Sequence, residues 1–73
     1  MTTEIKSPMS GSVWKVTVDV GQRVEEDQEV IILESMKMEI PILATEEGVV
    51  KEIFVAEGAF VSEGDVVVVI EAD

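Results

Sequence analysis

The run from Glu34 to Glu39, which reads Glu-Ser-Met-Lys-Met-Glu, is the part of this sequence whose residue types could do chemistry. Its lysine, Lys37, stands between two methionines and lies between the apolar stretches Val30 to Leu33 and Ile40 to Leu43. A lysine amine is a nucleophile that an enzyme can acylate once the enzyme has removed the proton the amine carries at neutral pH. Lys37 is therefore a candidate for covalent attachment of a group, with the chain supplying a position and no catalysis.

The same run must turn, because the apolar stretches on both sides have the length of strands, yet it contains no Gly, Asn, Asp or Pro. Two-residue hairpins favour Asn-Gly or Asp-Gly, since both central residues need a positive φ. A turn at Met36-Lys37 conflicts with this preference, and such conflicts are typical of functional sites. Local propensity alone leaves a short helix from Leu33 to Glu39 open as an alternative.

The residues beside Lys37 suit recognition by other proteins. Met36 and Met38 are flexible and polarizable, which favours a surface that several partners contact; the alternative is that they cover the end of a core. Glu34, Ser35 and Glu39 are candidate recognition residues for a modifying enzyme. The alternative for the glutamates is that they are ordinary solvated charges.

The composition excludes most other chemistry. The chain has no cysteine and no histidine, which excludes disulfides, thiolate zinc sites, cysteine nucleophiles and imidazole proton transfer. Sixteen acidic and five basic residues give a net charge of -11, which disfavours nucleic acid and anionic lipid surfaces as partners and favours a monomer in isolation. We expect no metal site and no catalytic residue. An enzyme with paired carboxylates is the alternative, although so many acidic residues make chance pairs common.

The length of 73 residues predicts one domain over residues 1–73, because so short a chain cannot divide its core. The N-terminus has no basic region followed by an apolar core, and the longest purely apolar run is Val66 to Ile70. We therefore expect neither a secretory signal nor a membrane span. Together with the absence of cysteine and the initial methionine, this predicts a cytoplasmic protein.

Apolar alternation predicts an all-β fold. Val16, Val18 and Val20 are separated by polar residues, which indicates a strand that begins near Val13 and buries one face. Further strands are expected where β-branched residues cluster. These are residues 30–33, 40–43, 49–55 and 66–70. Glycine-containing turns between them favour a sandwich or barrel.

A shift of 37 residues lays the first half of the chain on the second without a gap. The matched pairs include Gly11/Gly48, Val13/Val50, Val18/Val55, Gly21/Gly58, Val24/Val61, Val30/Val67 and Glu34/Glu71. The repeat predicts two similar β units around a pseudo-two-fold axis, with Lys37 at one end of the domain and the termini towards the other. It also predicts that Val18, Val55, Val30 and Val67 are buried.

The segment from Glu34 to Met38 resembles the attachment motif of biotinyl domains, in which Met-Lys-Met surrounds the modified lysine. The resemblance extends from about Glu4 to Glu71 and is closest to stand-alone biotin/lipoyl attachment proteins. It implies a flattened barrel or sandwich of two four-stranded antiparallel sheets, the biotinyl/lipoyl hammerhead. In that fold Lys37 would lie in the hairpin between the fourth and fifth strands.

The resemblance also implies a function, that of a carrier and not an enzyme. A biotin-protein ligase would join biotin to Lys37, and the resulting swinging arm would carry a carboxyl group between a biotin carboxylase and a carboxyltransferase. Related lipoyl domains usually have an acidic residue before the lysine, whereas this chain has Met36, so biotin is favoured. Attachment of lipoate by a lipoate ligase, or of both biotin and lipoate, stays open. An unmodified binding module is a further alternative.

Overall fold

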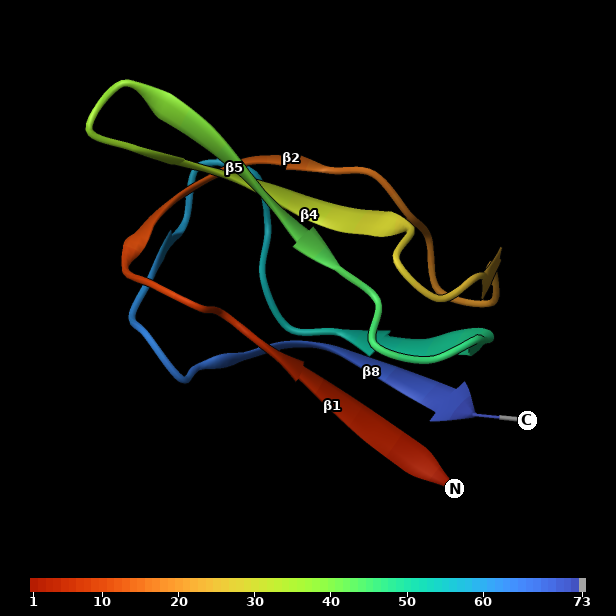
Figure 1. Ribbon diagram of the computed structural model, residues 1–73. Helices are drawn as coiled ribbons and strands as arrows, with labels where there is room; N and C mark the ends of the chain where they lie inside the picture. Colours follow the sequence, from red (N-terminus) through yellow and green to blue (C-terminus); the bar gives the residue numbers. More distant parts are fainter. Residues whose placement is uncertain (73) are drawn as a thin grey trace.

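The computed structural model describes residues 1–72, which form two four-stranded antiparallel sheets and no helix (Figure 1). One sheet has the order β1 (Thr2–Lys6), β8 (Val66–Ala72), β6 (Gly48–Ile53), β3 (Arg23–Val24). The other has the order β5 (Met38–Leu43), β4 (Glu29–Ser35), β2 (Gly11–Val16), β7 (Phe60–Val61). The fold implied by the resemblance is confirmed. Across these residues, no helix is long and apolar enough to cross a membrane.

The internal repeat is confirmed in the backbone. A shift of 37 residues exchanges the two sheets strand for strand, because β1 falls on β5, β2 on β6, β3 on β7 and β4 on β8. The Gly21 N–H donates to the Val50 carbonyl at 2.8 Å, and the Gly58 N–H donates to the Val13 carbonyl at the same distance. Both glycines have a positive φ, 91° and 90°, a conformation in which a residue with a side chain would be strained. The pseudo-two-fold symmetry of the sequence is thus also present in the backbone hydrogen bonds.

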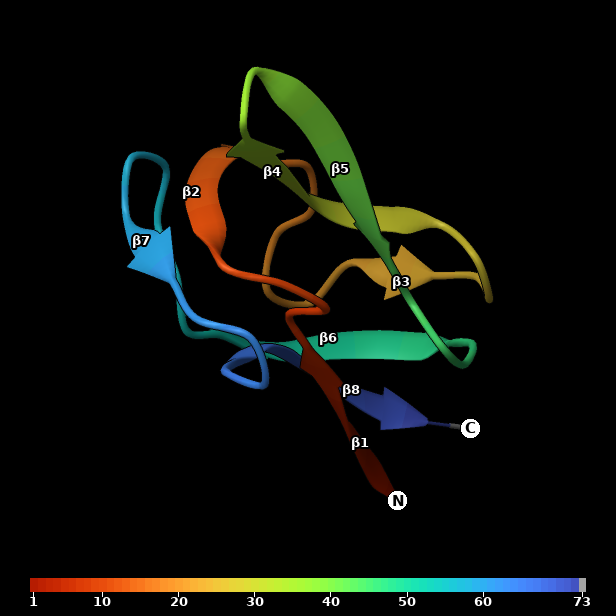
Figure 2. The same cartoon turned by 60° about the vertical axis from the view of Figure 1, so that its left-hand side comes forward.

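The core lies between the sheets and is entirely aliphatic in the described residues. Figure 2 shows β4 and β2 above β6 and β8. Val18, Val30 and Val67 are buried, as predicted, and burying each such side chain contributes roughly 1.5–3 kcal/mol. The prediction for Val55 is wrong, because Val55 is only partly buried at the edge of the core.

The strand predicted from near Val13 to Val20 extends further along the chain than the observed strand does. β2 ends at Val16, and Val20 is 63% exposed instead of buried. A register shift lies between Val13 and Lys15, and pairing with β4 continues past it to Val16, opposite Ile31. Val16 and Val18 still pack towards the core, whereas Val20 does not. The chain then leaves the ladder and turns, which places Val18 in a connection that folds over the core. Residue patterning alone also missed β1, β3 and β7, of which the last two are only two residues long.

The β4–β5 hairpin projects from one end of the domain, and both termini lie at the opposite end (Figure 1). This is the arrangement that the repeat predicts. It leaves the tip of the hairpin accessible to other proteins, while two paired strands fix the position of the tip.

Candidate functional site

The turn that carries Lys37 is a two-residue hairpin loop. β4 and β5 pair up to Ser35 opposite Met38, so that Met36 and Lys37 alone connect them. Both residues have a positive φ, 51° and 65°, which is the left-handed conformation that such a loop requires. The predicted hairpin is confirmed, and the alternative of a short helix from Leu33 to Glu39 is wrong.

The side chains of the turn are open to solvent. Met36 is 91% exposed and Met38 is 64% exposed, so the alternative in which the methionines cover the end of the core is wrong. Lys37 is exposed too, and within residues 1–72 no carboxylate lies within ion-pair distance of its amine. The amine is therefore accessible, with no partner to displace before acylation.

The candidate recognition residues occupy the last two pairs of the hairpin. Glu34 lies directly opposite Glu39, and both are exposed, so two like charges face each other just behind the turn. Ser35 is partly buried opposite Met38. The structure thus brings Glu34, Ser35, Met38 and Glu39 to the base of the turn, and Met36 lies in the turn beside Lys37.

Gly11 is a structural part of the site that sequence reasoning did not single out. A Cβ at this position would lie 2.9 Å from the backbone oxygen of Glu34 and 3.3 Å from the Cβ of Ser35. Only glycine lets β2 approach β4 this closely at the base of the hairpin. The pairing of Gly11 with Gly48 in the repeat was the signal, since both glycines are buried against a neighbouring strand.

The reactive group that the turn presents is the amine of Lys37. Over residues 1–72 no group of three or more His, Cys, Asp or Glu side chains is placed to hold a metal ion. What the geometry provides is one nucleophilic amine at a fixed, exposed position. An arrangement of this kind suits a group that is attached by one protein and used by another.

Comparison with known proteins agrees with this geometry. A family model described as "Biotin-requiring enzyme" matches residues 3–70. The chain therefore belongs to the biotin/lipoyl family. Within this family it is a carrier domain and not a catalytic unit.

Two curated relatives differ in how much of their length the chain covers. The chain is 58% identical to a biotin/lipoyl attachment protein of Bacillus subtilis over 66 residues, which are 90% of this chain and 88% of that protein. It is 48% identical to a biotin carboxyl carrier protein of Streptococcus mutans over 59 residues, which are 81% of this chain and 45% of that protein. The second relative thus has about as much sequence outside the match as within it.

Solved structures share the fold. The urea carboxylase of Kluyveromyces lactis superposes with a TM-score of 0.92 at 38% identity, over 97% of this chain and 6% of that one. A single-chain, multi-domain long-chain acyl-CoA carboxylase also gives a TM-score of 0.92, over 99% of this chain and 7% of that one. At 22% identity, this second likeness concerns the fold alone. The domain shape therefore recurs as a small part of much longer chains.

Proposed function

We propose that residues 1–73 act as one attachment domain whose Lys37 receives biotin through an amide bond. The observation that carries the proposal is the strained, exposed two-residue turn, in which Lys37 has a φ of 65° and stands at the tip of paired strands. In the attachment step, the amine nitrogen bonds to the carbonyl carbon of an activated biotin carboxylate, while the activating group and the amine's extra proton leave. When attached, biotin supplies the atom that holds a carboxyl group.

Biotin is favoured over lipoate. The matched family is described by its requirement for biotin, and the Streptococcus mutans relative is a biotin carboxyl carrier. The residues fit such a group, because the turn is open on its outer side and the amine has no competing ion pair within residues 1–72. Lipoylation of Lys37 is the second reaction to test, because the curated relative from Bacillus subtilis is named for both biotin and lipoyl attachment.

The carrier would serve a biotin-dependent carboxylase. Its arm, the lysine side chain plus the acyl chain of biotin, has about ten single bonds and reaches on the order of 10–15 Å. The strands hold the pivot, and the arm moves the attached group between a biotin carboxylase and a carboxyltransferase. A biotin-protein ligase would load it. Monomeric behaviour in isolation and a cytoplasmic location are further predictions.

The residues around the turn would guide the ligase. Met36 and Met38 offer exposed, adaptable apolar contacts on both sides of the amine. Glu34, Ser35 and Glu39 would set the orientation of the hairpin in the ligase. Loading replaces the positive charge of Lys37 by a neutral amide, so the facing glutamates then carry the local charge alone.

The test is to incubate the purified chain with biotin, ATP and a biotin-protein ligase, and to measure intact mass followed by peptide mapping. We expect one biotinyl group on Lys37 and none on Lys37→Ala or Lys37→Arg. Lys51→Arg, which alters an exposed lysine on β6, is the matched control and should load like the wild type. Biotin on another lysine, or no biotin on the folded wild type, would refute the proposal. A parallel reaction with a lipoate ligase tests the second acceptor reaction.

A further inference from the structure

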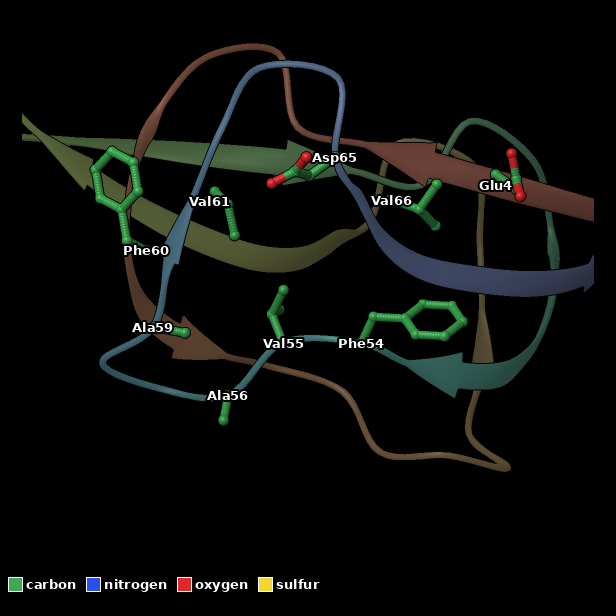
Figure 3. Close-up of a pocket in the computed structure, with 9 residues that line it drawn as sticks. All are labelled: Glu4, Phe54, Val55, Ala56, Ala59, Phe60, Val61, Asp65 and Val66. Atoms are coloured by element: carbon green, nitrogen blue, oxygen red, sulfur yellow. The ribbon is translucent and has the colours of Figure 1, made fainter.

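A groove of about 690 Å³ opens on the flank of the domain, and no residue of the β4–β5 hairpin lines it. Phe54 and Phe60 stand towards opposite ends of the groove, with smaller valine and alanine side chains between them (Figure 3). Glu4 and Asp65 contribute carboxylates to its edge. Phe54 is 57% exposed and Phe60 is 70% exposed, so this apolar surface faces solvent.

The internal repeat provides a second copy of this surface on the same backbone, but with polar side chains. A shift of 37 residues replaces Phe54 by Thr17, Ala56 by Asp19, Ala59 by Gln22 and Phe60 by Arg23. On that side the Thr17 hydroxyl donates to the Glu29 carbonyl at 2.9 Å, and the Asp19 N–H donates to Gln22 Oε1 at 3.1 Å. The fold thus accepts polar residues at these positions, so it does not itself require the two phenylalanines.

Each aromatic residue of the chain has a polar residue as its partner in the repeat. The sequence has two phenylalanines, one tryptophan and no tyrosine, and none of the three aromatic side chains is in the core. Trp14 is 43% exposed and lies on β2, which pairs with the β7 strand that carries Phe60. Its repeat partner is Lys51, again a polar residue. Exposed aromatic side chains are enriched at protein interfaces.

The core residues beside the groove also break the symmetry. Val18 is only 4% exposed, whereas its repeat partner Val55 is partly exposed and lines the groove. The depression thus exposes a side chain that the other half of the chain buries. This arrangement gives up some burial, which a bound partner would restore.

We propose that this groove docks the carboxylase protein that receives the tethered biotin. The partner inserts an apolar side chain between Phe54 and Phe60, and its Lys or Arg residues face Glu4 and Asp65. This inference rests on the function proposed above. The net charge of -11 disfavours a second copy of the chain as occupant and favours a basic partner.

The position of the groove suits a partner that takes the end of the arm. A ligase must contact Lys37 itself, whereas a partner that receives biotin can dock on the flank and leave the tip free. Phe60 pairs with Ser12, and Ser12 pairs with Glu34, so the groove begins two strand spacings, roughly 10 Å, from the base of the hairpin. The arm, on the order of 10–15 Å long, can span this distance.

The docking is tested without biotin by titrating ¹⁵N-labelled Lys37→Arg protein with purified biotin carboxylase and, separately, with carboxyltransferase. With at least one of them, we expect shifted or broadened amide signals in residues 54–61 and at the Trp14 indole, weakening as salt is raised. Signals that change only in residues 34–39, or nowhere with both partners, would overturn the inference. Because this variant cannot be loaded at residue 37, the result is independent of the proposed attachment.

A second test moves the polar residues of the repeat into the groove, in Phe54→Thr with Phe60→Arg. On loaded protein we expect the kcat/KM of the carboxylase reaction to fall about tenfold or more, with unchanged loading by the ligase. Val20→Arg is the matched control, because Val20 is 63% exposed and the change adds the same charge away from the groove. Phe54→Thr with Phe60→Gln removes the charge change, and the amide spectra verify folding.

The outcomes of this second test are separable. If Lys37 is not loaded in the wild type, the proposed function fails and the titration alone decides the docking. If all variants are loaded and turn over equally, the docking inference fails while the function stands. If the groove variants instead slow loading and leave carboxylation unchanged, the ligase occupies the groove and the inference is overturned.

Discussion

Replacing Met36-Lys37 by Asn-Gly should stabilise the unmodified domain, because the turn holds two ordinary residues in the left-handed conformation. With φ values of 51° and 65°, each residue costs roughly 1–2 kcal/mol relative to a right-handed conformation, or roughly 2–4 kcal/mol together. Glycine lowers this gain by about 0.5–1 kcal/mol, because it increases the entropy of the unfolded chain. Asparagine still has part of the energetic cost of a positive φ. We expect a net gain of about 1–2 kcal/mol, which corresponds to about 5–15 °C in Tm for a domain of this size.

The assay is thermal and urea unfolding of unmodified protein, followed by circular dichroism at fixed pH and salt. Asp27→Gly is the matched control, because Asp27 also has a positive φ, 70°, and its repeat partner is Gly64. Lys37→Gln separates the loss of charge from the change of backbone preference. If the Asn-Gly variant were no more stable than the wild type while Asp27→Gly gained stability, the turn would not be strained and the reasoning would fail. Met36→Asn alone retains Lys37, so its loading rate measures whether the ligase reads the methionine.

Three further outcomes test the fold and its electrostatics. Val18→Asp should cost several kcal/mol in urea unfolding, because it places an unpaired charge at a position that is only 4% exposed; wild-type stability would contradict this burial. Gly11→Ala should cost about 1–3 kcal/mol and shift the amide signals of the hairpin, since its Cβ would lie 2.9 Å from the Glu34 oxygen; unchanged spectra would refute the close approach. The N-terminal ammonium of Met1 donates a hydrogen bond to Glu71 Oε2 at 3.0 Å, and this bond and its positive charge hold the pKa of Glu71 below the ordinary value of 4.5. The resulting stabilisation is present above that ordinary value and is lost as the pH falls through the lowered pKa; in a carboxyl NMR titration, acetylation of the Met1 amine should raise the midpoint of Glu71, and an unchanged midpoint would exclude the interaction.

Local rules predicted much of the strand content. The runs that became β4, β5, β6 and β8 are rich in β-branched residues and bounded by turn residues, and these signals act between near neighbours in the chain. Symmetry between the halves added the placement of Lys37 opposite the termini, because two similar units must be joined at one end. The conflict between Met36-Lys37 and hairpin preference indicated an unusual turn, and both residues have a positive φ.

Where prediction failed, contacts between distant segments decided the outcome. The strand expected to continue to Val20 ends at Val16, because pairing with β4 stops there and the chain turns between Asp19 and Gln22, which residue alternation cannot reveal. β3 and β7 are two-residue strands that exist only through their partners β6 and β2. Their sequences are too short to carry a periodic signal of their own.

The sequence by itself determined that this is an all-β chain with two related halves and a single lysine in an improbable turn, because periodicity, glycine placement and composition are local properties. Only the tertiary structure decided which side chains those halves expose. Val18 and Val55 are identical residues at equivalent places in the repeat, yet one is buried and the other lines a groove. The difference follows from the neighbours that surround each valine, and burial depends on the packing of segments that are far apart in the chain.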